Sequence, residues 1–529
     1  NSFNHFLPNC YPSPMSSKPS KTQEVHRISV RSLVEFILQE GDLVSGGFQK
    51  RGRAQAGTKG HKKVQRSRPE SYQSEVEVAF QVESEDLPIE VRGRIDGLDT
   101  SQTPVLIEEI KTTTLALDLV HKNHNPLHWA QAQCYAYIYA QQEDLSEICI
   151  HLTYYHLDSQ TEKTFEQIFT LTELEVFFNA LITPYVAWFH KVRARQMQRN
   201  RSIETLDFPY GNYRLGQRDM AVAVYRAIRD HDRLYAQAPT GVGKTIATLF
   251  PAIKALGQGL AERIFYLTAK TPGRLVAEET LRDLRQVGLE FKSVTLTAKE
   301  KICFQPVVNC DPDECPFARN YFAKVKMALG EVDEQDAFTR PVIEKLARKH
   351  EICPFEFSLD LALWMDCVIC DYNYAFDPRV YLRRFFDFNT DPNIFLVDEA
   401  HNLPDRARAM YSAELDKQTV LVLHRSLKGN LPGLVKKLGV INKLLLEKRK
   451  ACQAEEVTAL VEHELPEELL KALEAFVRSA ENWLMLNQPA EFRQELLDFY
   501  FACLNYLRTA EHFDTFYVSY FERLGKSDL

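Results

Sequence analysis

The sequence predicts an α/β protein made of several domains. A chain of 529 residues is too long for a single hydrophobic core. Residues 234–270 read as a strand, a glycine turn, a helix and a second strand, and this alternation predicts a parallel sheet with crossover helices. Residues 28–194 read instead as a helix, three strands, a helix, one more strand and a long helix, which predicts a separate α/β or α+β domain. From residue 405 onward the pattern is almost purely helical.

The composition is that of a folded protein that is not basic overall. Apolar residues make up 45% of the chain, charged residues 26%, and the net charge is −8. This acidic average excludes a uniformly basic nucleic-acid coat, so any DNA contact must come from local basic tracts. Residues 191–201 form one such tract, which we interpret as a basic linker; a solvated helix end and a DNA contact are equally open.

The N-terminal residues, the apolar runs and the cysteines bear on the cellular location of the protein. Residues 1–14 are rich in Pro and Asn ahead of Met15, so residues 1–27 are expected to be a disordered or non-native leader. No run of about 18 uncharged apolar residues occurs, so no membrane span is expected. Eleven cysteines, no secretory signal and a cysteine cluster predict a cytoplasmic protein, associated with the nucleoid in a bacterium, with a metal site.

The segment LYAQAPTGVGKT, residues 234–245, has the pattern of a phosphate-binding loop. Residues 234–237 read as a strand, and the glycines that follow let backbone N–H groups approach phosphate oxygens at a helix N-terminus. Lys244 would reach the β- and γ-phosphates of ATP, and the Thr245 hydroxyl would bind Mg²⁺. The predicted nucleotide-binding residues are Ala238, Pro239, Thr240, Gly241, Val242, Gly243, Lys244 and Thr245.

The segment NIFLVDEAH supplies the acidic half of this site. An apolar strand, residues 394–397, ends in Asp398 and Glu399. Asp398 would hold Mg²⁺ through water, and Glu399 would orient or deprotonate the attacking water. His401 would couple the nucleotide site to the DNA-binding side.

Four cysteines lie between these two motifs and suit either a structural zinc ion or an iron–sulfur cluster. They are Cys303, Cys310, Cys315 and Cys353. Zinc sites usually show two close pairs of cysteines, whereas one close pair with two distant ligands favours a cluster. Cys367 and Cys370 also form a CxxC pair, but their strand-like surroundings predict buried side chains.

Residues 61–135 carry a candidate metal-dependent hydrolytic site. Asp96 ends one predicted strand, and Glu109 and Lys111 share a face of the next. Two carboxylates from adjacent strands can hold a divalent metal, with His61 as a further ligand, and Lys111 can position water near a phosphate. Gln131 and Tyr135 share one face of the following helix. A salt-bridged sheet edge in a DNA-binding domain is the alternative.

The motifs from residue 213 onward resemble those of XPD/DinG-type superfamily 2 DNA helicases. The matching segments are YRLGQRDMAVAVYRAI, APTGVGKT, FYLTAKT, ICDYNYAFDP and VDEAHN, in that order. The resemblance implies a RecA-like parallel-sheet motor, a 4Fe-4S domain on the four cysteines, and 5′→3′ movement on single-stranded or forked DNA in repair or replication. It also implies that Gln217 reads the adenine edge and that Thr268, Ala269 and Lys270 line the DNA path.

The front residues resemble the RecB-type PD-(D/E)XK nucleases over about residues 28–194. The ordered set is His61, Asp96, Glu109, Lys111, Gln131 and Tyr135, and the resemblance implies Mg²⁺ or Mn²⁺ as the bound metal. The expected protein is thus an ATP-dependent DNA helicase joined to a DNA nuclease. The alternatives are a DNA-remodelling protein with an inactive front domain, and a nuclease in which ATP is only a switch.

This resemblance divides the chain into domains. We expect the nuclease-like domain at residues 28–200, the first motor domain at 205–300 and 366–404, the iron–sulfur domain at 301–365 and a helical arch at 405–529. The second motor domain of the helicase family is expected to be absent from these 529 residues.

Overall fold

The computed structural model describes residues 25–43, 51–84, 87–157, 159–239, 241–386, 392–484 and 490–523. These residues fall into two compact units, one within residues 1–371 and 388–398, the other within residues 372–387 and 399–529. Residues 1–24 of the expected leader lie outside the described residues, but its end was placed too late, because residues 26 and 27 already belong to a strand paired within the front sheet. No helix in the described part of the chain has the length and apolar character needed to cross a bilayer.

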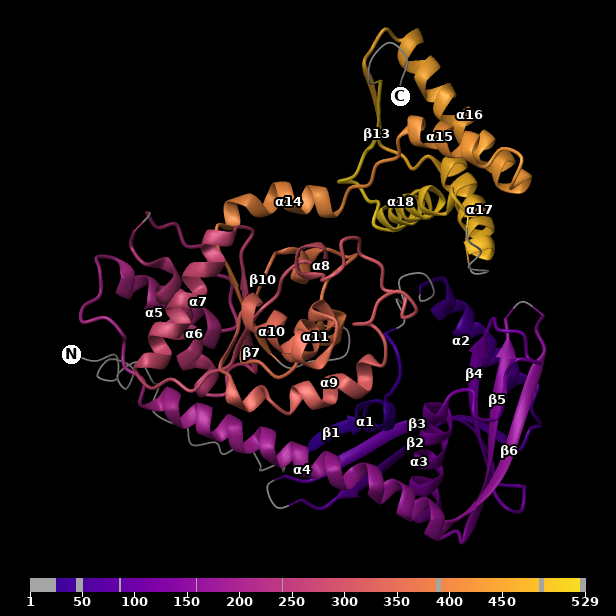
Figure 1. Ribbon diagram of the computed structural model, residues 1–529, viewed down its shortest axis with the longest axis horizontal. Helices are drawn as coiled ribbons and strands as arrows, with labels where there is room; N and C mark the ends of the chain where they lie inside the picture. The colour runs from indigo at the N-terminus through magenta and orange to yellow at the C-terminus, as the bar shows by residue number, and fades with distance from the viewer. Residues whose placement is uncertain are drawn as a thin grey trace. The chain divides into compact units, whose positions relative to one another are not determined.

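The front of the first unit is a mixed six-stranded sheet (Figure 1). Its strands run in the order β1-β3-β4-β5-β6, with β2 paired to β3. They are β1 (His26–Ser29), β2 (Tyr72–Val82), β3 (Ile89–Asp99), β4 (Leu106–Thr113), β5 (Glu147–His156) and β6 (Glu162–Thr170). The β1–β3 and β4–β5 pairs are parallel and the others antiparallel. The helices of this part are α1 (Val30–Leu38), α2 (Arg51–Arg66), α3 (Pro126–Gln142) and α4 (Leu171–Glu204).

Local signals in the sequence set the ends of these helices. The Asn125 side chain accepts a hydrogen bond from the N–H of Leu127 at 3.0 Å and caps α3, whose first residue is a proline. Thr170 and Glu173 form a capping box at the start of α4. α3 buries most of its length, including Ala132, against the sheet, which accounts for its apolar composition.

The other part of the first unit, where the sequence predicts a motor domain, contains an all-parallel sheet, as the alternating pattern predicts. Its order is β11-β7-β10-β8-β9. The strands are β7 (Arg263–Leu267), β8 (Ser293–Thr295), β9 (Ala337–Phe338), β10 (Cys367–Cys370) and β11 (Asn393–Val397). The helices are α5 (Gln217–Arg229), α6 (Lys244–Gly257) and α7 (Thr271–Gln286). Cys367 and Cys370 are 0% and 3% exposed in β10, which confirms that they are core residues.

The strand predicted at residues 234–237 does not form. In the structure this segment pairs with no strand, and Leu234 and Tyr235 are 43% and 89% exposed. β11 is an edge strand whose Phe395 is 42% exposed. A strand requires ladder partners, and residues 234–237 have none among the described residues.

The cysteine region is helical and adds one short strand to the motor sheet. It contains α8 (Lys299–Ile302), α9 (Tyr321–Leu329), the 3-10 helix η3 (Val332–Glu334), α10 (Arg340–His350) and α11 (Pro354–Ala362). β9 lies within this region and pairs with β8. The region also contacts the front domain, because Leu43 N–H donates to the Ala318 carbonyl at 2.8 Å and Lys326 Nζ to the Ile37 carbonyl at 2.7 Å.

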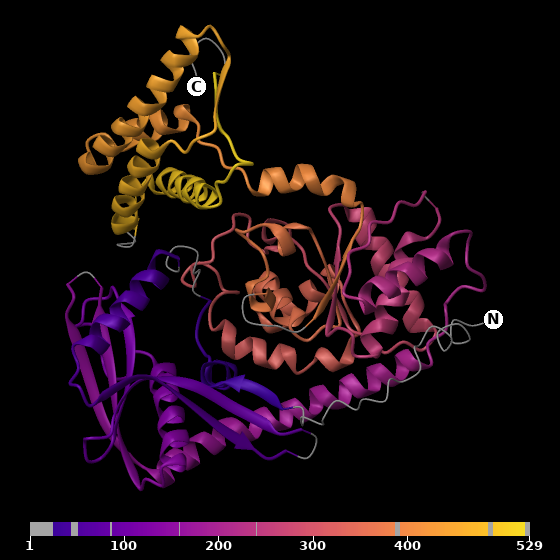
Figure 2. The ribbon, with the colours of Figure 1, turned by 180° about the vertical axis from the view of Figure 1, so that it is seen from behind.

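The second unit is helical with one antiparallel strand pair, which the sequence pattern did not predict (Figure 2). Its helices are α12 (Asn373–Phe376), α13 (Arg383–Phe386), η4 (Ala400–Asn402), α14 (Leu403–Met410), α15 (Lys417–Ser426), α16 (Pro432–Ala454), α17 (Glu467–Leu484) and α18 (Arg493–Glu511), and its strands are β12 (Ala459–Glu462) and β13 (Ser519–Glu522). Phe476 and Phe499 meet in its core with ring centroids 5.2 Å apart.

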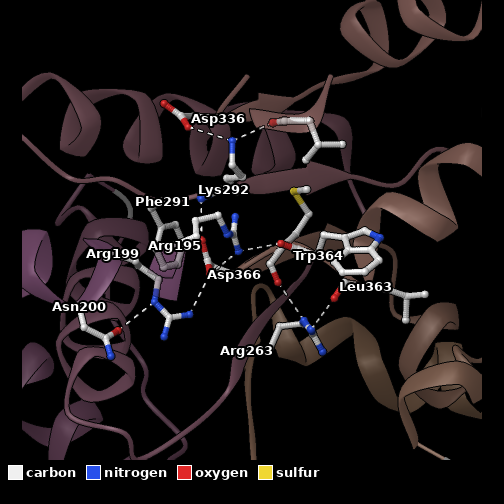
Figure 3. Close-up of polar contacts among 12 residues, drawn as sticks. Arg195, Arg199, Asn200, Arg263, Phe291, Lys292, Asp336, Leu363, Trp364 and Asp366 are labelled. Carbon is white, nitrogen blue, oxygen red and sulfur yellow. Dashed lines mark hydrogen bonds and ion pairs between the residues drawn. The ribbon is translucent and has the colours of Figure 1, made fainter. Parts of the chain in front are cut away.

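The helix α4 contributes to two hydrophobic cores of the first unit. Phe178 packs into the front core and Ile203 into the motor core. The basic tract 191–201 lies within this helix, so the expectation of a linker is wrong. Arg195 and Arg199 point toward Asp366, which precedes β10 (Figure 3). Because Arg199 is 8% exposed and its charge is paired, it is part of a buried contact between the two parts.

Candidate active sites

The first candidate site lies where β3, β4, α2 and α3 meet. Asp96 on β3 accepts a hydrogen bond at Oδ2 from the N–H of Ile110 on β4, at 2.8 Å. Its Oδ1 lies 3.7 Å from His61 Nδ1 on α2. Gly60 lets α2 lie close to β4, because a methyl group there would lie 2.8 Å from Cγ2 of Thr112. The structure thus brings together the predicted residues His61 and Asp96, from segments 35 positions apart in the sequence.

Glu109 and Lys111 lie side by side on β4, as their spacing predicts. Lys111 Nζ is 2.5 Å from Glu109 Oε1 and donates to Gln131 Oε1 on α3 at 2.8 Å. Burial raises the pKa of the Glu109 carboxyl to about 7; Lys111 opposes this shift, and the nearby Asp96 carboxylate adds to it. The negative charge of the ionised Glu109 carboxyl is poorly compensated by its protein neighbours. Such a carboxyl fits a cation-binding site, because a divalent ion would favour its ionised form.

Tyr135 forms the support of this site on α3. It is 8% exposed, and its ring lies against Gly93 of β3, where even a methyl group would collide with it. Burial, with the carboxylates of Glu109 and Asp96, raises the pKa of the Tyr135 hydroxyl well above its usual range. Tyr135 is therefore a neutral side chain packed behind the acidic residues.

A buried carboxylate next to the site was not predicted. Glu108 is 1% exposed and accepts hydrogen bonds from Arg68 Nη2 at 2.6 Å, Tyr72 Oη at 2.8 Å and Thr153 Oγ1 at 2.5 Å. Burial alone would raise the pKa of this carboxyl, but these donors outweigh it and lower the pKa. Adjacent carboxyls thus differ in state because only Glu108 has a full set of donors.

The second candidate site is the loop before α6. Gly241 and Gly243 have φ values of 85° and 83°, the left-handed conformation that glycine adopts without strain, and Lys244 and Thr245 open the helix. Ala238, Pro239 and Val242 lie along the same loop, and Thr240 lies outside the described residues. Successive N–H groups at a helix N-terminus suit a phosphate.

Gln217 holds this loop from α5. It is 3% exposed and is therefore a buried residue rather than a surface residue of this helix. Its Oε1 accepts from the N–H of Arg214 at 3.0 Å, and its Nε2 donates to the Gly243 carbonyl at 3.3 Å. Arg214 also donates to the carbonyl of Gly241. Both polar ends of the Gln217 side chain are therefore engaged within the protein.

Asp398 follows β11 and faces the start of α7. Its N–H donates to the Leu267 carbonyl at 2.9 Å, and Oδ2 lies 3.5 Å from the Thr268 hydroxyl. A methyl group at Gly273 would lie 2.7 Å from Oδ2. Thr268 thus contacts the predicted magnesium ligand, while Ala269 and Lys270 continue to the start of α7, for which Lys270 is the N-cap.

Glu399 and His401 belong to the second unit. Glu399 has a φ of 53°, a conformation that costs a non-glycine residue energy and is concentrated at functional sites. Its carbonyl accepts from Tyr372 Oη at 3.1 Å, and its Oε2 lies 3.4 Å from His401 Nδ1. The His401 side chain is 70% exposed and open to solvent.

Of the four predicted cysteine ligands, Cys303 and Cys353 lie at the ends of α8 and α11, Cys310 lies beside α8, and Cys315 is buried in the loop between these helices. Cys303 ends α8, and Cys353 is the N-cap of α11, where the N–H groups of Phe355 and Glu356 face its sulfur. Burial raises the pKa of the Cys353 thiol to about 11, against the effect of these N–H groups. Cys310 hydrogen-bonds with Lys299, a residue that the sequence reasoning missed. A helix N-terminus and an ammonium group stabilise thiolates, so these residues fit an anionic metal–thiolate centre.

Comparisons with known proteins find distant relatives among DNA helicases. Human regulator of telomere elongation helicase 1 is 22% identical over 304 residues, 47% of this chain and 23% of that protein. The XPD helicase subunit of general transcription and DNA repair factor IIH from Dictyostelium discoideum is 22% identical over 242 residues, 40% of this chain and 30% of that protein. This chain therefore matches less than a third of the length of these relatives.

Among solved structures, an XPD helicase matches 57% of this chain and 52% of its own, with a TM-score of 0.36 and 17% identity. A truncated XPD matches 55% of this chain and 81% of its own, with a TM-score of 0.35.

Two family profiles match the chain itself. The DEAD_2 profile matches residues 275–420, which include Asp398 and Glu399. The profile of the PD-(D/E)XK nuclease superfamily matches residues 17–319, more than half of the chain, and this range contains the complete first candidate site. The chain therefore belongs to the PD-(D/E)XK nuclease superfamily and carries a DEAD_2 helicase region distantly similar to XPD-type helicases.

Proposed function

We propose that the protein is an ATP-dependent DNA helicase of the XPD/DinG type, moving 5′→3′, coupled to a metal-dependent DNA nuclease that acts in repair or replication. The observation that carries the nuclease half is the convergence of Asp96, Glu109, Lys111 and Gln131 from β3, β4 and α3. These side chains come from three different elements. The single positive charge of Lys111 balances only part of the negative charge of the two carboxylates. A merely structural ion pair between Glu109 and Lys111 does not require the second carboxylate, Asp96.

In the nuclease site Asp96 and Glu109 would hold Mg²⁺ or Mn²⁺, with His61 beside Asp96. The bound metal would supply Lewis-acid activation of water and of the scissile phosphate. Lys111 is held by Gln131 at 2.8 Å, so its ammonium group is fixed at the edge of the site, where it can orient water. Tyr135 packs behind these residues and fixes their position.

In the motor site the loop of Gly241, Gly243 and Lys244 would bind the phosphates of ATP. Thr245 and Asp398 would hold Mg²⁺, and Glu399 would act on the attacking water. Gln217 would keep the loop in its binding conformation through the Gly243 carbonyl. Single-stranded or forked DNA is the proposed substrate, gripped largely through its phosphates.

Cys303, Cys310, Cys315 and Cys353 would hold a 4Fe-4S cluster beside the motor sheet. The cluster would supply a cross-link between α8, the following loop and α11. Lys299 and the N-terminus of α11 would offset the negative charge of the thiolates.

The test is DNA cleavage by the whole 529-residue chain with Mn²⁺ or Mg²⁺. We expect cutting of single-stranded DNA without ATP. Asp96→Ala should abolish it, and Lys111→Ala should lower the rate by about 10²-fold or more while metal binding persists. Glu77→Gln, at an exposed side chain of β2, is the matched control and should cut normally.

The motor half is tested on the same preparation. Lys244→Ala should lose ATP binding and leave cutting unchanged. A well-folded protein that binds DNA and never cleaves it would favour the DNA-remodelling alternative. Cleavage that survives Asp96→Ala would place the nuclease site elsewhere.

A further inference from the structure

A second set of metal-ligand side chains lies on the β5–β6 pair. Cys149 and His151 are two residues apart on β5, so they share one face, and His151 pairs directly with Glu166 on β6. One ligand atom from each residue lies within 4.8 Å of the other two. His151 Nε2 and Glu166 Oε2 are 3.0 Å apart.

The three side chains differ in solvent exposure. Cys149 is 8% exposed, the His151 side chain 27% and the Glu166 side chain 64%. The thiol is therefore at the bottom of the group and the carboxylate at its rim. An ion can reach the group from solvent without a change in the backbone.

This group is distinct from the nuclease site. Glu109 and Lys111 on β4 alternate with Glu108, and it is Glu108 that pairs with His151 across the β4–β5 ladder. The Glu108 carboxylate is already bound by Arg68, Tyr72 and Thr153. Cys149, His151 and Glu166 therefore form a separate set on the face of the sheet opposite Glu109.

We propose that Cys149, His151 and Glu166 bind a zinc-class divalent cation. A thiolate with an imidazole and a carboxylate selects a borderline-soft ion over Mg²⁺ or Ca²⁺. Ligand atoms about 2.0–2.3 Å from a tetrahedral zinc ion lie roughly 3.3–3.8 Å apart, so small side-chain rotations would close this group around the ion. Three protein ligands leave a fourth position for water.

Metal binding would link the edge strand β6 of the front sheet to β5. β6 is the last strand in the order, and Glu166 is its contribution to the site. A metal bridge from β5 to β6 would add a bond across this pair that does not depend on the backbone ladder.

The test is Co²⁺ titration of the whole chain, read by the thiolate-to-cobalt charge-transfer band in the near ultraviolet. Cys149→Ser should lose one equivalent of this band relative to the wild type, and Glu166→Gln should keep the band but weaken binding at least tenfold. Cys134→Ser, at a fully buried cysteine of α3, is the matched control and should titrate like the wild type. Taking differences between variants removes the signal of the four clustered cysteines.

Asp96→Ala separates this site from the nuclease, because it should leave the charge-transfer band unchanged. Identical titrations of the wild type and folded Cys149→Ser would overturn the proposal and leave His151–Glu166 as a plain ion pair. Loss of the band in Asp96→Ala would do the same, because the thiolate signal would then depend on the nuclease site.

Discussion

Arg199 on α4 and Asp366 before β10 form a buried ion pair, with Nη1 2.8 Å from Oδ1 and side chains 9% and 3% exposed (Figure 3). The N–H of Lys292, just before β8, donates to the other carboxylate oxygen at 2.7 Å. One carboxylate thus joins the helix from the front domain to the segments that enter two motor strands. Trp188 of α4 also packs against Trp364, two residues before Asp366, with ring centroids 4.6 Å apart.

Arg199→Met should destabilise the first unit by about 3 kcal/mol, because it leaves the Asp366 carboxylate buried with Arg195, at 3.4 Å, as its remaining ionic partner among the residues that the structure describes. Urea unfolding of the whole chain measures this loss. Arg340→Met removes an i,i+4 pair with Glu344 on the surface and should cost less than about 0.5 kcal/mol. Equal losses of unfolding free energy in the two variants would contradict the assignment of Arg199 to a buried ion pair.

Lys254 on α6 should make stability depend on pH. Its Nζ donates to the Ile203 and Glu204 carbonyls at the end of α4, at 2.6 and 3.3 Å. Burial lowers the pKa of this ammonium group to about 8 from 10.5. Between these values the unfolded chain keeps a proton that the folded chain releases, so this group's contribution to stability rises with pH.

The comparison is with Lys254→Met across pH 7.5 to 9.5. The free energy of unfolding of the wild type, minus that of the variant, should increase over this range. Lys471→Met, at an exposed residue of α17, serves as the control and should show no such trend. A difference that stays constant or falls with pH would rule out the buried ammonium group as its source.

Gly273→Ala should impair magnesium-dependent ATP binding. The added methyl group would lie 2.7 Å from Asp398 Oδ2 and would also meet the Thr268 hydroxyl, so the carboxylate must move. We expect affinity for ATP with Mg²⁺ to fall about tenfold, while affinity in EDTA stays unchanged. Gly433→Ala, where a methyl group meets nothing within 4 Å, should bind like the wild type. Equal loss with and without Mg²⁺ would point to a general distortion of the loop.

Cys353→Ser should remove the iron. The purified chain should be brown with about four irons, and the variant should lose both colour and iron because one of four thiolates is gone. Cys367→Ala, in the core strand β10, should keep the iron. Stoichiometric zinc with negligible iron after anaerobic purification would instead assign the four cysteines to zinc.

Features that depend on short-range spacing were predictable. Glu109 and Lys111 share a strand face because strand side chains alternate. Gln131 and Tyr135 share a helix face because residues four apart do so. The all-parallel motor sheet followed from the alternation of strands and helices.

Features that depend on distant pairing were not predictable. Arg199 and Asp366 are 167 residues apart, and nothing near either residue indicates the other. The basic composition around Arg199 suggested solvent or DNA, although a buried carboxylate is its partner. The segment at Leu234 shows that local composition can also predict an element that does not form. Its composition suits a strand, but no strand among the described residues pairs with it.

Because α4 packs into two cores, insertions and deletions within this helix are constrained. Each residue inserted into an α-helix rotates everything beyond it by about 100° and advances it by about 1.5 Å. A single insertion between Phe189 and Arg195 would therefore turn Arg195, Arg199 and Ile203 away from their partners while leaving the front core intact. Loops elsewhere tolerate changes in length, but this helix has a fixed phase. Insertions and deletions in α4 should be eliminated by selection even where every individual side chain is replaceable.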